Sequence, residues 1–440
     1  MSGPKVVRIV TREEILEICH GHLARVDAAL AEWIRIGRRN ACIGEDEVAA
    51  ATGRRDALAK LIAADRFMDL QKQALIEEGF LRDDIQARLA KVAAAQAAAR
   101  GRERREVEAA KSLLRALRAG CRSIDPDLEA GLERGDAAAL SRGFQLLSAN
   151  VTVPGASSEL AAGLREEGSS RTFAAWLASQ PTQLVDPALE RIEVRLEELA
   201  LCLDDDTILP LRRRLDEALG ATPARRALIL DGLEVETGRA LTDARRRGAL
   251  VSDLSILLAE VSAAGLPTNS YERGLDGLDT ASLELRLAQA RETLTAHRAG
   301  LAAAARRTAV LAGLAGLGYE VNEGMATMFA QNGKLVLRSA TRPDYGVEVS
   351  AVGGAERMQM RAVAFEAGGR GPDPARDRDA ETIWCGDVST LQDRLAEVGG
   401  GLRIERALPV GATPLKRIAV DGTVPPAGAE VPVLRERTLR

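Results

Sequence analysis

Proline is missing from a long stretch near the start of this chain, since none occurs between Pro4 and Pro126. The same stretch is rich in Ala, Leu, Arg and Glu, residues that favour helix. Because proline breaks a helix interior, its absence leaves room for helices longer than an ordinary globular domain uses. A helix of about 70 residues would span roughly 100 Å. The stretch therefore predicts a coiled coil or an extended helical hairpin.

Aromatic residues are scarce as well, at 3% of the chain. Surfaces that bind nucleic acid bases or sugars stack them on aromatic side chains, so the scarcity disfavours such a surface. No apolar run reaches the roughly 18 residues that suggest a membrane span, and the first residues lack the apolar core of a signal peptide. We therefore expect a cytoplasmic protein without a membrane partner.

Cysteine and histidine are too few and too scattered to predict metal or thiol chemistry. The five cysteines occur singly, which argues against a disulfide framework and favours a reducing cytosol. Cys19, His20 and His22 are neighbours, but on a helix the two histidines point about 200° apart and cannot share one ion. His297 lies on an apolar seam and is expected to fix helix pairing more than to sense pH. We predict no metal, no cofactor and no catalytic residue.

The charge of the chain gives little support for binding nucleic acid. Its formal net charge is -4, and its N-terminal third has only a small basic excess. The densest basic cluster is Arg100–Arg105, which Glu103 and Glu106 dilute, so we interpret it as a solvated helix face. A nucleic-acid-associated helical rod that uses this cluster stays the first alternative.

The N-terminal part of the chain predicts helices with recognisable starts. Residues 5–10 are expected to be extended, and Thr11 with Glu14 forms a capping box for a helix to about Asn40. A second helical region follows over Glu45–Ala119, either as one rod or as two or three stacked helices.

Heptad patterns predict which faces of these helices pack. In the first region the leucine and methionine residues that recur at seven are Leu61, Met68 and Leu75. After Pro187 a second set has the spacing of a coiled-coil seam: Leu189, Ile192, Leu196, Leu199, and later Leu287 and Leu294. The segments 45–120 and 187–300 have similar lengths, and we expect them to pair antiparallel, within one chain or between chains.

The pattern changes after Gly318, where strands are expected. Three runs of strand length are separated by turn residues and predict an antiparallel meander: 334–339, 346–352 and 358–365. Glu381–Cys385 is predicted as a further strand and Ser389 as the start of a helix, before a last strand at Leu402–Arg406.

Two carboxylates in this region resemble the acidic pair of restriction-type nucleases, but the match is poor. Asp344 and Glu348 are too close in sequence, and Ser350 stands where that pattern needs a lysine. We interpret them as a turn aspartate and a solvent-facing strand glutamate. An enzyme with its site in this region stays the second alternative.

The sequence thus predicts a mainly α protein with long helical, hairpin-like coiled-coil arms and a small C-terminal α+β domain, a meander plus helix. The expected divisions are 1–44 for an N-terminal arm and helix, 45–120 for a long helix, 121–186 for a helical connector, 187–304 for a second coiled-coil region, 305–422 for the α+β domain and 423–440 for an extended tail.

Such an architecture favours a non-enzymatic scaffold or adaptor that binds other proteins or a second copy of itself. The heptad residues named above would form the helical interface. Arg342, Asp344, Tyr345 and the loop 368–379 would form a recognition surface. The Arg-rich composition is typical of a high-GC bacterial genome, and such a protein would serve in a multi-protein bacterial system for stress or phage defence. No residue of the chain carries that last assignment.

Overall fold

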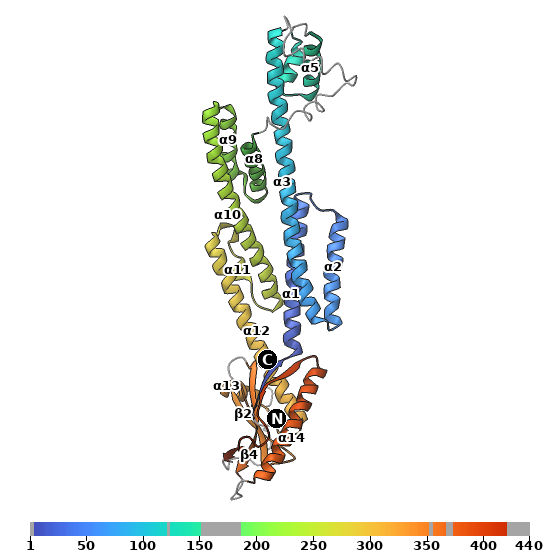
Figure 1. Cartoon of the computed structure of the whole chain (residues 1–440), viewed down its shortest axis with the longest axis vertical. Helices are drawn as coiled ribbons and strands as arrows, with labels where there is room; N and C mark the ends of the chain where they lie inside the picture. The colour runs from blue at the N-terminus through green and yellow to red at the C-terminus, as the bar shows by residue number, and fades with distance from the viewer. Residues whose placement is uncertain (1–3, 121–123, 151–185, 352–354, 367–372, 420–440) are drawn as a thin grey trace, which may run out of the picture.

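The computed structural model describes residues 4–120, 124–150, 186–351, 355–366 and 373–419. Figure 1 shows an elongated molecule in which long helices run side by side, with a sheet at one end and short helices at the other. The C-terminal tail predicted at 423–440 and most of the connector lie outside the described residues. The prediction of a mainly helical protein with long arms and an α+β region is confirmed.

The helices and strands follow one another in an order that begins and ends with strands. The longer helices are α1 (Arg12–Arg39), α2 (Glu45–Ala63), α3 (Phe67–Gly120), α8 (Pro187–Cys202), α9 (Asp205–Gly220), α10 (Pro223–Ala263), α12 (Thr280–Gly316) and α14 (Pro374–Glu397). The shorter ones are α4 (Pro126–Glu133), α5 (Ala137–Asn150), α11 (Asn269–Glu272), η2 (Leu275–Gly277) and α13 (Met325–Asn332). The strands are β1 (Lys5–Val10), β2 (Lys334–Arg338), β3 (Tyr345–Ala351), β4 (Arg357–Glu366), β5 (Gly401–Ala407) and β6 (Lys416–Ala419). None of the described helices combines the length and the apolar composition needed to cross a membrane.

Helix α1 begins where the capping box predicted. The Thr11 side chain accepts a hydrogen bond from the backbone N–H of Glu14 over 3.3 Å, which satisfies a donor that the first turn leaves free. The helix ends at Arg39, one residue from the expected boundary. Because α1 starts directly after β1, this cap fixes the angle at which the chain leaves the sheet.

The region predicted at Glu45–Ala119 as one rod or as two or three stacked helices consists of two helices, α2 and α3. Asp65 lies between α2 and α3 with a φ of 53°, in the left-handed region that ends a helix. The 54 residues of α3 then continue without interruption, a length of about 80 Å. The predicted seam was wrong here, because Met68 is 64% exposed and Leu75 is 55% exposed.

The buried stripe of α3 lies on a neighbouring face, where α1 and α2 pack. Its residues are spaced four, seven and four apart: Leu70, Ala74, Leu81 and Ile85. This spacing mixes small and large side chains, so a search for leucines at sevens passes over it. Alanine at position 74 lets the neighbouring helix approach closely.

The two arms pair antiparallel within one chain, as one of the predicted alternatives stated. Arg100 of α3 binds Glu197 of α8 over 2.9 Å, and Arg104, one turn further along α3, binds Glu193, one turn earlier on α8. Closer to the sheet, Arg82 of α3 binds Asp253 of α10. Both arginines join the arms. The expected solvated face at Arg100–Arg105 was wrong for Arg104, whose side chain is 29% exposed, while Arg100 remains 50% exposed.

The predicted heptad residues of the second arm are buried in two clusters inside the chain. The first cluster joins α8, α9 and α10 and contains Leu189, Ile192, Leu196 and Leu199. The second joins α10 and α12 and contains Leu287 and Leu294, beside Leu254 and Leu257. These side chains form the core of the helical arm, so they are not exposed for contact with another protein.

The sheet draws strands from both ends of the chain. Its strand order is β2-β3-β4-β1-β5. The short β6 pairs in parallel with the C-terminal half of β4. The antiparallel meander β2-β3-β4 is confirmed. Strand β1 lies between β4 and β5 and is antiparallel to both, so the N-terminal strand completes a sheet that is otherwise C-terminal.

One face of the sheet packs against helices α12 and α14. Trp384, Val388 and Leu391 of α14 are almost fully buried there, together with Leu314 of α12. The predicted strand at Glu381–Cys385 and the predicted helix start at Ser389 were both wrong, because both lie inside α14.

Helix α14 begins at Pro374 and is capped by Asp373, whose side chain accepts hydrogen bonds from two backbone N–H groups. Both residues fall in the predicted loop 368–379, and their capping chemistry is the sequence signal for the start of this helix.

Candidate functional site

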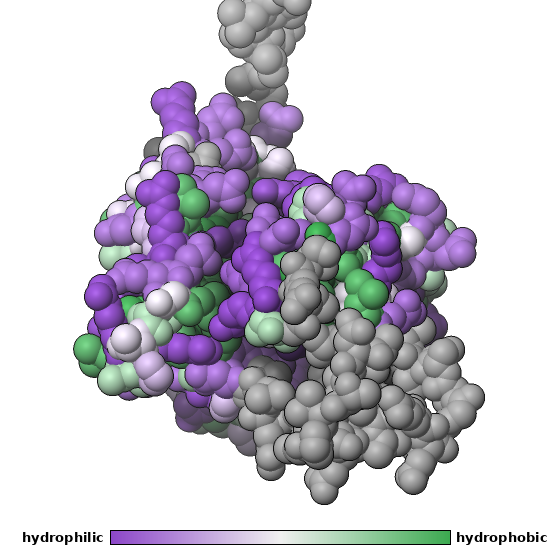
Figure 2. Space-filling view, turned by 90° about the horizontal axis from the view of Figure 1, so that it is seen from above, coloured by the Kyte–Doolittle hydropathy of each residue, from purple (hydrophilic) through white to green (hydrophobic). Residues whose placement is uncertain are grey.

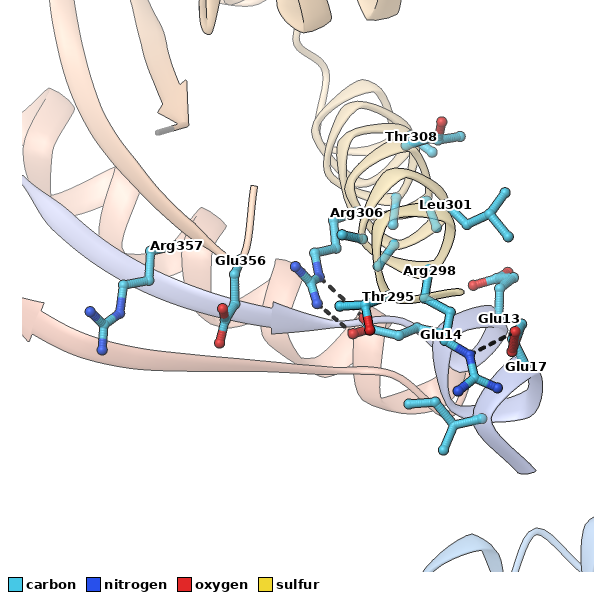
Figure 3. A pocket seen from close by; sticks show the side chains of 17 residues that line it. Glu13, Glu14, Glu17, Thr295, Arg298, Leu301, Arg306, Thr308, Glu356 and Arg357 are labelled. Atoms are coloured by element: carbon cyan, nitrogen blue, oxygen red, sulfur yellow. Dashed lines mark hydrogen bonds and ion pairs between the residues drawn. The ribbon is translucent and has the colours of Figure 1, made fainter. Parts of the chain in front are cut away.

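A groove of about 1140 Å³ lies where the helical arm meets the sheet. Its lining comes from the first turns of α1, the second half of α12 and the start of β4, as Figure 3 shows. These segments are far apart in the sequence and are held together because β1, directly before α1, pairs with β4. The groove is thus a product of the sheet topology.

The floor of the groove is a face of α12 on which alanine is the commonest residue, at six of the eleven positions that line it. The alanines that line it are Ala299, Ala302, Ala304, Ala305, Ala309 and Ala312. Methyl side chains hold the surface back toward the helix axis, so another helix could approach it closely. Two large apolar side chains line this groove, Ile18 of α1 and Leu301 of α12, and Leu301 is 48% exposed.

Ion pairs between α1 and α12 form one wall of the groove. The Arg306 Nε donates to Glu14 Oε2 over 3.1 Å, and the Arg298 Nε donates to Glu17 Oε1 over 2.9 Å, as the dashed lines in Figure 3 mark. Arg306 is only 8% exposed, and the Glu14 carboxylate stabilises its buried charge. The opposite side carries Glu356 and Arg357, at the start of β4.

A buried network of charges continues from this wall into the helical arm. Arg298 also donates to Glu260 of α10 over 2.7 Å, and Glu260 accepts from Arg25 of α1 over 3.2 Å. Arg25 in turn donates to Glu78 of α3 over 2.8 Å. The hydrogen bond to Glu78 is the main reason that the pKa of Arg25 is raised above its usual value. The network links four helices at the level where they cross.

Gly21 has no side chain, and this leaves the space that the charge network occupies. A Cβ atom built on Gly21 would lie 2.2 Å from Arg298 Nη2, so a larger residue would displace that guanidinium. Within the described residues, Arg298 Nη2 and Glu17 Oε2 are buried without a hydrogen-bond partner. Both atoms belong to the Arg298–Glu17 pair that lines the groove.

The three histidine and cysteine neighbours on α1 are spread over different environments. Cys19 is fully buried, His20 is exposed, and His22 is half-buried beside the charge network. Burial is the main cause that lowers the pKa of His22, and Glu260 opposes it. His297 is half-buried on α12, at the edge of its apolar seam.

The predicted recognition residues lie away from the groove, Arg342 and Asp344 in the loop between β2 and β3 and Tyr345 at the first position of β3. Asp344 is exposed, Arg342 is half-buried, and the Tyr345 hydroxyl donates to Asp377 of α14 over 3.1 Å. Burial, followed by this hydrogen bond, raises the pKa of Tyr345. None of these three residues lines the groove. Part of the predicted loop 368–379 lies outside the described residues.

Glu348 was expected to face solvent, and that expectation was wrong. It is 3% exposed on β3 and accepts hydrogen bonds from Arg361 and Lys416, while Lys334 lies 3.0 Å away. Basic residues on the neighbouring predicted strands were a signal for this burial, because facing strands place such residues side by side.

Sequence reasoning also missed the residues that form the groove wall. Arg306 and Arg307 interrupt the most apolar window of the chain, and a charge in such a window indicates a buried partner. That partner, Glu14, lies 292 residues away, and no local pattern connects the two.

Compared with models of protein families, with curated proteins and with solved structures, the chain has no significant match. The functional assignment therefore depends on the geometry of the arms, the sheet and the groove.

Proposed function

We propose that this protein is a non-enzymatic cytoplasmic scaffold or adaptor. The observation that carries the proposal is the open alanine face of α12, set between charged walls at the point where the arm joins the sheet. A groove with an apolar floor and a polar rim accepts an amphipathic helix, a recurring mode of protein recognition. The partner is a protein that presents such a helix.

The elongated shape supports the same function. Helix α3 reaches from the level of α2 to the short helices α4 and α5, which pack on its far end through Leu113, Leu117 and Leu140. The sheet lies at the opposite end of the molecule. A rod that separates two small folded ends can hold two partners at a fixed distance, which an adaptor requires.

Surface hydropathy is consistent with local recognition sites. Seen from above, the described surface is mostly hydrophilic, and hydrophobic residues show only in scattered places between charged ones (Figure 2). Self-association through the predicted heptad leucines has little support, because these residues are buried in the arms. A homo-oligomer would have to use another surface.

The alternative of a nucleic-acid-associated rod has less support, because two arginines of its basic cluster form ion pairs within the chain. Arg100 and Arg104, from the densest basic cluster, bind Glu197 and Glu193 of the same chain. Their charges are therefore largely neutralised within the arm, which weakens their attraction for phosphates.

The test compares two substitutions on exposed leucines of the same helix. Leu301→Asp places a charge in the groove, while Leu285→Asp, at a position 60% exposed and outside the groove, is the matched control. Both sites are at the surface, so we expect both variants to fold with stabilities within about 0.5 kcal/mol of the original.

The tagged full chain and both variants would be purified from the native host and examined by mass spectrometry and light scattering. We expect a protein in stoichiometric amount with the original chain and with Leu285→Asp, and its loss from Leu301→Asp. Retention by both variants would overturn the role of the groove. A chain that purifies alone as a monomer would overturn the scaffold function.

A further inference from the structure

The face of the sheet opposite to α12 and α14 carries a cluster of basic side chains. Val347 and Val349 of β3 point into the core, so Glu348 between them points to the other face. Three cations from three different strands surround it there: Lys334 of β2, Arg361 of β4 and Lys416 of β6. We call these three residues and Glu348 the β-face cluster.

All three cations of the β-face cluster contact the same carboxylate. Lys416 Nζ lies 2.6 Å and Lys334 Nζ 3.0 Å from Glu348 Oε2, and Arg361 Nε donates to Glu348 Oε1 over 2.8 Å. Sheet register explains the convergence. On β4, Arg361 is paired directly with Glu348. On β2, the residue paired with Glu348 is Val336, which is two positions from Lys334 on the same face. The carboxylate is thereby buried under its own counterions.

The β-face cluster has more positive charge than Glu348 can neutralise. Among the described residues, the ion pairs of Lys334, Arg361 and Lys416 all go to Glu348, which leaves an excess of two positive charges. Two ammonium groups that share one carboxylate oxygen repel each other, and a further anion would relieve that repulsion. Each ammonium group has three donors, and the guanidinium group has five, so donors remain for such an anion.

The cations of the cluster are also accessible from outside. The Glu348 side chain is 4% exposed, whereas those of Lys334, Lys416 and Arg361 are 46%, 35% and 32% exposed. An incoming ligand would therefore meet the positive groups and not the carboxylate. Exposed cations over a buried carboxylate attract an anion.

A fourth cation extends the same face along β2. Arg338 is two positions from Val336 on the outer face, and its guanidinium lies 4.7 Å above the ring of Phe365. The Phe365 ring packs over Gly346, where a Cβ would be 2.8 Å from it. The ring holds Arg338 against the sheet, so this cation is positioned without a carboxylate partner among the described residues.

We propose that the β-face cluster, together with Arg338, binds a phosphate group. A phosphate monoester carries a charge of about -2 at pH 7, which matches the excess charge of the cluster. Its oxygens accept hydrogen bonds in several directions, and so can bridge two lysines and the fork of an arginine. A carboxylate carries one charge and would neutralise half of the excess. A small phosphate compound supplies both charges on one group, and a nucleic acid backbone supplies them on two neighbouring phosphates with one charge each. The experiment separates these two sources.

The first experiment is a calorimetric titration of the full chain with inorganic pyrophosphate at about 50 mM salt, where phosphate contacts are strong. We expect saturable binding that Lys334→Met with Lys416→Met weakens at least tenfold, since each charged hydrogen bond contributes about a tenfold factor or more. Lys72→Met removes an exposed lysine of α3 and is the control, with unchanged binding expected.

Lys416→Met alone is the second variant, because it leaves Lys334 and Arg361 on Glu348 and preserves more of the sheet if the double variant does not fold. It should also weaken pyrophosphate binding. Circular dichroism establishes that each titrated variant is folded. Absence of saturable binding to the original chain, or equal binding by the folded variants, would overturn the proposal.

The second experiment identifies the source of the phosphate with a labelled single-stranded oligonucleotide of about 15 nucleotides, followed by fluorescence anisotropy. Binding that pyrophosphate displaces and that the lysine variants lose indicates a nucleic acid backbone. Pyrophosphate binding without oligonucleotide binding indicates a small phosphate compound. Oligonucleotide binding that the lysine variants retain would contradict a site at the β-face cluster.

Discussion

Arg306, in the most apolar part of α12, is bound by Glu14 in the first turn of α1. The two residues are 292 positions apart in the sequence, yet they join the helix that leaves the sheet to the helix that returns to it. Since Arg306 is 8% exposed, the pair is largely buried and each charge stabilises the other.

Glu14→Gln should therefore destabilise the protein strongly. The change removes the Glu14 carboxylate from the buried Arg306 guanidinium, and breaking such a buried pair costs about 3 kcal/mol. Urea unfolding followed by circular dichroism measures this loss. The double variant Glu14→Leu with Arg306→Leu removes both charges and should recover most of the stability. A double variant less stable than Glu14→Gln would show that the pair is not a unit.

Gly21→Ala tests the packing of the charge network. The new methyl group would lie 2.2 Å from Arg298 Nη2 and 3.1 Å from Glu260 Oε1, so Arg298 must move away from its partners. We expect a loss of about 1–3 kcal/mol, measured by thermal or urea unfolding. Gly53→Ala on α2 is the matched control, because nothing lies within 4 Å of its added Cβ. That control should gain about 0.5–1 kcal/mol. Similar effects of the two substitutions would contradict the close approach at Gly21.

The β-face cluster makes stability depend on pH through Glu348. Burial alone would raise its pKa, but hydrogen bonds from Lys416, Lys334 and Arg361 outweigh burial and lower the pKa to about 2. The folded pKa thus lies below the ordinary value of 4.5. The stabilisation is therefore complete above about pH 5 and is lost as the pH falls through 4.5 toward 2.

Glu348→Gln should remove this contribution, which is of the order of 3 kcal/mol near pH 7. The difference in unfolding free energy between the original chain and the variant should shrink as the pH is lowered from about 5 to 3. Urea unfolding at a series of pH values measures it. A difference that stays constant over this range would contradict the lowered pKa.

Local signals in the sequence predicted the parts of the fold that depend on neighbours along the chain. The cap at Thr11, the heptad at Leu189–Leu199 and the meander after Gly318 each follow from side chains a few residues apart. In each case the signal is a pattern of side chains within one element or across neighbouring segments of the chain. Such patterns can be recognised without knowing the tertiary structure.

Partners that are distant in the sequence account for what was missed. The exposure of Met68 and Leu75 follows from the position of α1, which packs on another face of α3. The burial of Glu348 requires Lys416, 68 residues further on. The groove exists because β1 pairs with β4 and β5, whose residues are more than 300 positions away. A pattern read within one element contains no information about these contacts.

Reversing one charge at the contact between the arms tests their pairing within one chain. Arg104 of α3 donates to Glu193 of α8 over 3.0 Å, and both side chains are largely buried. Arg104→Glu places two carboxylates against each other and should cost about 2–4 kcal/mol in urea unfolding. Adding Glu193→Arg restores opposite charges and should recover most of that loss.

Arg102→Glu is the control for this reversal, because Arg102 is exposed on the same helix. A surface reversal should change the unfolding free energy by no more than about 0.5 kcal/mol. The recovery by the second substitution must also be independent of protein concentration, since the two residues belong to one chain. If Arg104→Glu behaved like Arg102→Glu, or if recovery required a high protein concentration, the arms would not pair as the contact between Arg104 and Glu193 requires.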